Sequence, residues 1–116
     1  MQKDILDRTF KFSARIIKLA NNLPKNPAGF AIANQIVRSG TSIGANIQEA
    51  QSAPSKKDFA NKLSISLKEA RETGYWLDLI VESELVGKSR IVSLRQECEE
   101  VIKILVSSLK SIKNNS

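Results

Sequence analysis

The stretch that decides the fold is RSGTSIGANIQEA, residues 38–50. It contains no proline and no aromatic residue, and its two glycines, Gly40 and Gly44, stand four positions apart among small side chains. Such a stretch is either a loop that cradles a ligand or a helix that a neighbouring helix approaches closely. The choice matters, because the first interpretation suggests an enzyme and the second suggests a packing or assembly module.

The helical interpretation explains this stretch better than a phosphate-binding loop does. A P-loop needs two glycines five positions apart, followed by Lys and Ser or Thr and preceded by a strand. Residues 40–44 read GTSIG, no lysine follows them directly, and no strand pattern precedes them. On a helix, Gly40 and Gly44 share a face with Val37 and Ile47. Because each glycine costs a helix roughly 1 kcal/mol relative to alanine, we expect this helix to be closely packed, central and the most buried.

Three groups of turn residues divide the chain into four segments. The breaks lie at residues 21–29, 52–59 and 85–90. The segments lie at about 4–22, 28–52, 55–84 and 89–113, with Ser55 and Ser89 as expected N-caps of the last two. Apolar residues recur in each segment at spacings of three and four, and no hairpin signal or alternating pattern is present. The sequence therefore predicts one domain over residues 1–116, an all-α antiparallel up-and-down four-helix bundle.

The expected core consists of the positions that share one face in each segment. These are Ile5, Thr9, Phe12, Ile16, Ala20 and Leu23 in the first, Ile32, Ile36, Ile43 and Ile47 in the second, Phe59, Leu63, Ser66, Ala70, Thr73, Leu77 and Ile80 in the third, and Ile91, Leu94, Cys98, Val101, Leu105 and Ile112 in the fourth. We expect Cys98 to behave there as an inert small apolar side chain.

Composition excludes several classes of function. The chain of 116 residues contains no histidine and one cysteine, which removes the commonest general base and any Cys-cluster zinc site. No apolar run approaches the roughly 18 residues of a membrane span, and residues 1–17 lack a signal-peptide core. A single cysteine also agrees with a reducing compartment. We therefore expect a cytoplasmic protein with no cofactor, no metal, no membrane contact and no small-molecule substrate.

Arg38 is the only charged residue between Lys25 and Glu49. An arginine on a mostly apolar helix is expected to have a carboxylate partner. Glu69 and Glu72 of the third segment could supply it, as could Glu49 of the same helix. Two roles remain open for Arg38, an ion pair that fixes helix register and an anion-binding site.

Other polar and aromatic residues suggest contacts between helices or between subunits. We expect Gln35 and Asn46 to form hydrogen bonds across helices, or to join Glu49 in a subunit interface. Tyr75 and Trp76 are the only strong aromatic pair. One of them is expected in the core and the other at a covered edge, although Trp and Tyr also anchor subunit contacts.

Positive charge is concentrated in the first and last segments. Lys and Arg number 18 against 12 Asp and Glu, giving a net charge of +6. Residues 1–25 hold six basic and two acidic residues, and residues 88–116 hold six and three. These segments would be neighbours in a bundle, so we expect their basic faces to merge into a surface suited to a phosphate backbone. Its expected contributors are Arg8, Lys11, Arg15, Lys18, Arg95, Lys103 and Lys110. The alternative is a solvated helical face without a partner.

Two stretches of the chain resemble a known family. QIVRSGTSIGANIQEAQ and SKKDFANKLSISLKEARETGYWL are similar to the bacterial four-helix-bundle proteins encoded in intervening sequences of 23S ribosomal RNA genes. The matching positions are Arg38, Ser39, Ser42, Ile43, Ala45, Asn46, Ile47, Glu49, Ser55, Asp58, Phe59, Leu63, Ile65, Ser66 and Glu72. The chain departs from many relatives at Lys68 and Glu69, where they have Gly-Ser, and at residues 48–50, where they have AEG. Its first segment also lacks their tryptophan.

The resemblance implies a ring of subunits, a homopentamer, without enzymatic activity. A distantly similar protein is the accessory subunit of diversity-generating retroelements, a basic pentameric barrel that works with a reverse transcriptase and nucleic acid. Our first hypothesis is a non-enzymatic homo-oligomer whose basic surface contacts RNA or DNA without strong sequence preference. The alternative is a protein–protein interaction adaptor with no nucleic-acid role. An enzyme would need an acid–base pair, which only Glu49, Glu69, Glu72 and Arg38 could supply.

Overall fold

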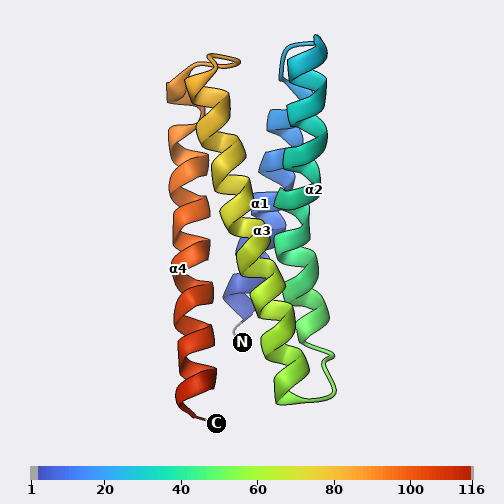
Figure 1. Cartoon of the computed structure of the whole chain (residues 1–116), viewed down its shortest axis with the longest axis vertical. Helices are drawn as coiled ribbons and strands as arrows, with labels where there is room; N and C mark the ends of the chain where they lie inside the picture. The colour runs from blue at the N-terminus through green and yellow to red at the C-terminus, as the bar shows by residue number, and fades with distance from the viewer. Residues whose placement is uncertain (1–2, 116) are drawn as a thin grey trace.

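The computed structural model describes residues 3–115 and contains four long helices. They are α1 (Lys3–Asn21), α2 (Pro27–Ala50), α3 (Lys56–Glu82) and α4 (Val92–Asn114), with a short 3₁₀ helix, η1 (Lys88–Arg90), before α4. The helices run alternately up and down (Figure 1), and no strand occurs in the described part of the chain. The predicted four-helix bundle is confirmed, with helix bounds within a few residues of those expected.

Side-chain caps explain where α2 and α3 begin. Asn26 Oδ1 accepts a hydrogen bond of 2.8 Å from the backbone N–H of Gly29. Ser55 Oγ accepts one of 3.1 Å from the N–H of Asp58, which confirms Ser55 as an N-cap. The prediction for Ser89 is wrong, because this serine lies within η1 and α4 begins only at Val92, with Ile91 as a cap that has no side-chain acceptor.

Helix α3 ends in a left-handed residue that is not glycine. Glu84 has φ of 60°, and the N–H of Leu85 reaches back to the carbonyl of Ile80 at 3.1 Å. This is the Schellman arrangement, in which the left-handed position usually belongs to glycine. The backbone of Glu84 is therefore strained, because a side chain disfavours this left-handed conformation.

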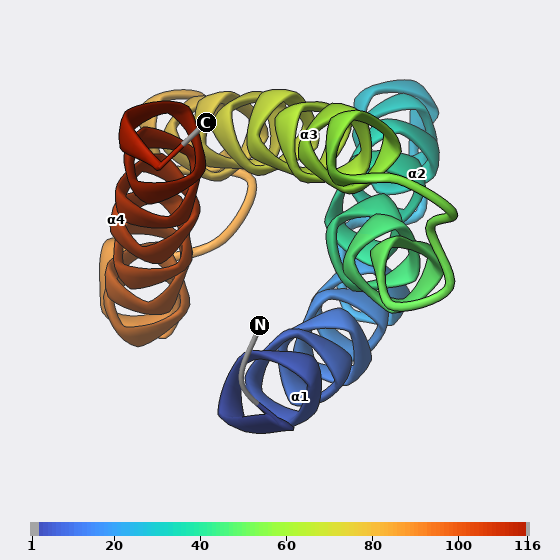
Figure 2. The ribbon, with the colours of Figure 1, turned by 90° about the horizontal axis from the view of Figure 1, so that it is seen from below.

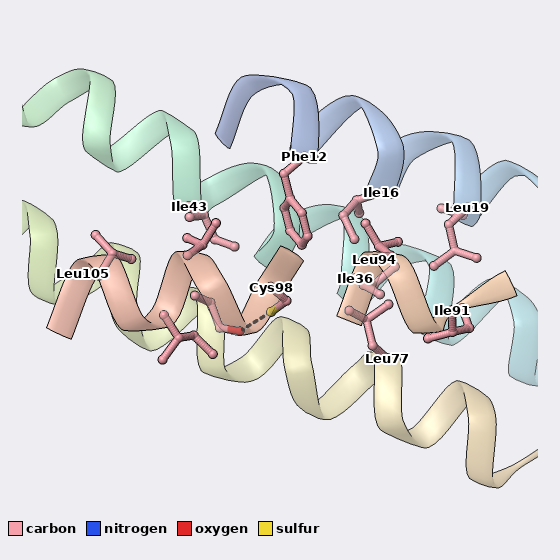
Figure 3. Packing of buried hydrophobic residues seen from close by; sticks show 14 of the residues in the cluster. Phe12, Ile16, Leu19, Ile36, Ile43, Leu77, Ile91, Leu94, Cys98 and Leu105 are labelled. Carbon is pink, nitrogen blue, oxygen red and sulfur yellow. Dashed lines mark hydrogen bonds between the residues drawn. The ribbon is translucent and has the colours of Figure 1, made fainter. Parts of the chain in front are cut away.

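The core occupies the faces that periodicity predicted. All of the expected core positions are buried except Ile32, Phe59 and Ile112, which are partly buried and pack against the core. Figure 3 shows side chains of the four helices meeting there, with the Cys98 thiol donating to the Ala70 carbonyl at 3.3 Å. Burial raises the pKa of the Cys98 thiol to about 11, so it stays protonated at neutral pH.

The opening stretch is helical, and its glycines mark a close approach to α1. Residues 38–50 lie within α2. A Cβ added at Gly40 would lie 2.8 Å from Ile16 Cγ2, and one added at Gly44 would lie 3.2 Å from Thr9 Oγ1. Side chains larger than hydrogen would force the two helices apart. The helical interpretation is therefore confirmed, and the partner of this face is α1.

The expectation that α2 is central and the most buried helix is only partly met, because α2 packs extensively on two neighbours but shares the inner position with α3 (Figure 2). The helices follow one another around an arc, as Figure 2 shows, with α1 and α4 at its two ends. Helix α2 packs mainly on α1 and α3, and α3 packs mainly on α2 and α4. Each inner helix thus has two principal neighbours and an outer face in solvent, and Phe30 of α2 is 55% exposed.

The α1–α4 contact that closes the arc is the least extensive of those between neighbouring long helices. Polar side chains join the two helices, since Arg8 binds Glu97 and Arg15 donates to Ser93. The apolar contact lies next to them, where Leu19 of α1 and Leu94 of α4 are both nearly buried. This junction brings basic residues of α1 next to α4.

Candidate nucleic-acid interface

Arg38 joins α2 to two carboxylates of α3. Its Nη1 lies 3.0 Å from Glu69 Oε2, and its Nη2 pairs with Glu72. Trp76 Nε1 also donates to Glu72 at 3.0 Å. The Trp76 hydrogen bond, together with Arg38, lowers the pKa of the Glu72 carboxyl. The expected ion pair with Glu69 and Glu72 is therefore confirmed, and it links α2 to α3.

The other polar residues expected between helices lie on the flanks of α2. Asn46 Nδ2 donates to the carbonyl of Ser42 at 2.8 Å, within its own helix. Gln35 is exposed and has no polar partner among residues 3–115. The expectation that both bond across helices is wrong, because small buried hydroxyls do so instead: Thr73 Oγ1 of α3 donates to Ser39 Oγ of α2 at 2.9 Å.

Glu49 has a partner other than Arg38. Lys62 Nζ of α3 lies 2.8 Å from Glu49 Oε1. Glu49, Glu69 and Glu72 are all therefore engaged in ion pairs. The set of residues that could have supplied an acid–base pair is occupied in holding α2 against α3.

Tyr75 and Trp76 stack edge to face, with ring centroids 5.1 Å apart. Tyr75 is 59% exposed, whereas Trp76 is half-buried and packs against the core. The expected division between core and edge is only partly met, since neither ring is fully buried. The exposed Tyr75 ring remains on the surface of α3.

Three of the seven expected basic residues are held in ion pairs with carboxylates. Arg8 binds Glu97 through two hydrogen bonds of 3.0 and 2.8 Å. Lys11 lies 3.0 Å from Asp7. Arg95 lies 2.9 Å from Asp78 and 3.1 Å from Glu99. These carboxylates raise the pKa of Arg8 and Arg95 and offset much of the positive potential around them.

Two other expected residues gather around a recess between α1 and α4. We call it the α1–α4 recess; its volume is about 240 Å³, and its lining consists of Arg15, Lys18, Leu19, Asn22, Arg90 and Leu94. Arg15 Nη2 donates to Ser93 Oγ at 3.1 Å, which ties its guanidinium to α4. The lining brings together three cations and contains no carboxylate.

The remaining two, Lys103 and Lys110, lie on the other side of α4. Together with Arg71 of α3 they line a wider depression of about 450 Å³, which we call the α3–α4 patch. Glu99 belongs to the same lining. The cations of this patch therefore share their surroundings with a carboxylate, unlike those of the recess.

The expected single basic face is therefore divided, and helical geometry explains why. Glu97 faces α1. Lys103 comes six residues later on α4, and at about 100° per residue its side chain points about 120° away from that of Glu97 around the helix axis. The prediction of merged faces was wrong because it compared charge totals of segments without their phases. It also did not name Arg90, although this residue was counted in the charge of residues 88–116, or Arg71, which lies in a segment without excess positive charge.

Among residues 3–115 no group of three or more Cys, Asp or Glu side chains is arranged to hold a metal ion. Nor does any helix in that range have the length and apolar character needed to cross a membrane.

Comparisons with known proteins identify the family. The chain matches the family described as 23S rRNA-intervening sequence protein over residues 1–107. It is also similar to a crystal structure from Bacteroides thetaiotaomicron VPI-5482, described as a protein with unknown function from the S23 ribosomal protein family. The two are 43% identical with a TM-score of 0.87, and the match covers 91% of this chain and 98% of that one. No curated protein matches. Neither description names a catalytic activity. These matches show that the chain belongs to the 23S rRNA-intervening sequence protein family.

Proposed function

We propose that this protein is a non-enzymatic, homo-oligomeric helical bundle that contacts RNA or DNA in the cytoplasm without strong sequence preference. The observation that carries the proposal is the grouping of cations outside ion pairs. The α1–α4 recess gathers three of them and the α3–α4 patch three more, on a chain with a net charge of +6. Clustered cations of this kind are the electrostatic footprint of a phosphate-binding surface.

The surroundings of these cations favour binding to the backbone rather than to bases. The linings of the recess and the patch contain Leu, Ile, Val, Ser and Asn beside the charged residues, and no aromatic ring on which a base could stack. Phosphate contacts position a nucleic acid but do not read its sequence. We therefore expect affinity to depend strongly on salt and weakly on sequence.

Fluorescence anisotropy with labelled RNA and DNA of unrelated sequences tests this proposal. We expect similar affinities for all sequences at about 50 mM salt. If about six phosphates are contacted, affinity falls roughly 1,000-fold by about 200 mM. Absence of binding at low salt would refute the nucleic-acid role. Binding of an acidic protein in its place would favour the interaction adaptor.

Exposed apolar side chains on α1 and α2 support the self-association in this proposal. Phe10 is 76% exposed and Ile17 43%, and they lie one heptad apart on α1, while Phe30 of α2 is 55% exposed. Large exposed apolar side chains commonly mark protein contacts, and these three lie on two helices that pack together. We propose that subunits of a homopentamer meet through this surface.

Light scattering with two matched variants tests the assembly. We expect the wild-type protein to have the mass of five chains, and Phe10→Ser to reduce it. Ile65→Ser is the control, because Ile65 is 42% exposed on the different helix α3. A wild-type mass of one chain, or equal effects of the two variants, would contradict the proposed interface.

A further inference from the structure

We infer that the α1–α4 recess holds one phosphate group of the bound nucleic acid and anchors it, while the α3–α4 patch contributes only general attraction. This inference rests on the proposed function and names the part of the basic surface that carries it. Three observations support the assignment: the charges in the lining, the direction from which they approach, and the apolar support beneath them.

The charge of the recess is of one sign. Arg15, Lys18 and Arg90 contribute three positive charges, and no carboxylate lines it. Within residues 3–115, neither Lys18 nor Arg90 has a carboxylate within ion-pair distance. An incoming phosphate therefore displaces no existing ion pair, whereas at Arg8 or Arg95 it would compete with a carboxylate already bound.

The cations approach the recess from two elements. Arg15 and Lys18 are three residues apart on α1 and so lie on neighbouring turns of one face. Arg90 comes from η1, just before α4. Groups converging from two sides surround a single compact anion, whereas cations along one helix form a track. Two guanidinium groups also suit the forked hydrogen bonding that phosphate oxygens accept.

The recess rests on a rigid base. Leu19 and Leu94, which line it, are 8% and 4% exposed and belong to the core. Arg15 is restrained further by its hydrogen bond to Ser93. Restraint before binding reduces the entropy lost when a ligand binds.

Two other hollows among residues 3–115 are less suited to phosphate. The α3–α4 patch contains Glu99. A groove farther along the same two helices is lined by Asp78 and Glu82 as well as Lys88 and Arg95. Carboxylates repel a phosphate and already neutralise some of these cations. The α1–α4 recess differs from both in having three cations and no carboxylate in its lining.

Two double variants with equal change in charge test the inference. Lys18→Gln/Arg90→Gln removes two positive charges from the recess, and Lys103→Gln/Lys110→Gln removes two from the α3–α4 patch. All four side chains are exposed, so we expect both proteins to fold, which circular dichroism and thermal unfolding would verify. In RNA anisotropy at about 50 mM salt, we expect the recess variant to bind at least about tenfold more weakly, with a salt slope reduced by about one because one phosphate contact is lost. The patch variant should lose less than about threefold.

A comparison of RNA bearing a 5′-phosphate with the same RNA bearing a 5′-hydroxyl identifies the source of the phosphate. A preference of wild-type protein for the 5′-phosphate that disappears in the recess variant assigns the site to a terminal phosphate. Equal wild-type affinity, with the same loss in the recess variant, assigns it to an internal phosphodiester. Equal losses in the two double variants would overturn the inference and leave the proposed function intact. Failure of the wild-type protein to bind RNA at all would remove both.

Discussion

Replacing Gly40 by alanine tests whether the close approach of α1 and α2 determines the packing. The new methyl would lie 2.8 Å from Cγ2 and 2.9 Å from Cγ1 of Ile16, whereas carbon atoms pack favourably at about 3.5–4.0 Å. Ile16 is completely buried, and its β-branched side chain has few alternative rotamers in a helix. The clash must therefore be relieved by a shift of the helices.

Two opposing contributions set the magnitude of this effect. Overpacking a core typically costs about 1–3 kcal/mol, while replacing a mid-helix glycine by alanine gains about 1 kcal/mol. The expected net change is a loss of stability of about 0–2 kcal/mol. Gly74→Ala is the matched control, because the three atoms nearest its new methyl all belong to the guanidinium of Arg95, at 3.3–3.6 Å. This guanidinium is the end of a long side chain, so it can shift by a few tenths of an ångström and keep its ion pairs with Asp78 and Glu99. The two variants should therefore differ by about 1–3 kcal/mol, with Gly74→Ala the more stable.

Chemical denaturation followed by circular dichroism measures both variants, at one fixed protein concentration because assembly would contribute to stability. A double-mutant cycle adds a second test. Ile16→Ala alone should lower the free energy of unfolding by about 2–5 kcal/mol. The methyl introduced by Gly40→Ala would partly fill the space left by the Ile16 side chain, so the double variant should lose less stability than the sum of the two single losses. Equal stabilisation by Gly40→Ala and Gly74→Ala, with no coupling to Ile16, would refute the reasoning.

Four shorter predictions follow from other contacts. Glu84→Gly should raise the free energy of unfolding by about 1 kcal/mol in the same denaturation assay, because glycine adopts the φ of 60° at this position without strain. An unchanged or lower free energy of unfolding would show that the Glu84 backbone is not strained. Arg38→Ala should lower the thermal unfolding temperature by leaving the buried carboxylate of Glu69 without its partner, and a folded variant with unchanged unfolding temperature would exclude this role. The pKa of the Glu72 carboxyl is lower in the folded protein than its ordinary value near 4.5, so ionised Glu72 stabilises the fold above that pH, and this stabilisation is lost as pH falls through the folded pKa. The difference in free energy of unfolding between wild type and Glu72→Gln should therefore shrink in acid. A difference that stays constant with pH would contradict this role of Glu72. Cys98, buried and with a pKa of about 11, should resist the thiol reagent DTNB at about pH 8 until the protein is unfolded, and rapid labelling of the native protein would show that the core opens.

The local pattern of residues 38–50 predicts a closely packed helix but not which helix packs against it. Their composition predicted a helix whose glycines allow a close neighbour, because glycine at this spacing leaves a groove along one face. The identity of that neighbour required the tertiary structure: Ile16 and Thr9 of α1 fill the groove. Position along the chain could not distinguish α1 from α3 or α4, since each presents an apolar face of similar character.

Arg38 and the basic residues illustrate two different limits. For Arg38 the sequence reduced the partners to three carboxylates, and the structure selected Glu69 and Glu72 because α3 lies beside that turn of α2. For the basic residues the charge totals predicted one merged surface. The azimuth of each side chain divided it instead, placing Arg15 in the α1–α4 recess and Lys103 in the α3–α4 patch.

The sequence by itself determined the four helices, their bounds and the face that each buries, because hydrophobic periodicity and turn residues act over a few neighbouring positions. Only the tertiary structure decided the arc-like order of the helices, the pairing of charges and the gathering of Arg15, Lys18 and Arg90 into one recess. These features depend on the rotation and spacing of whole helices. That geometry is set by how all the side chains of the core fit together, and not by any single segment.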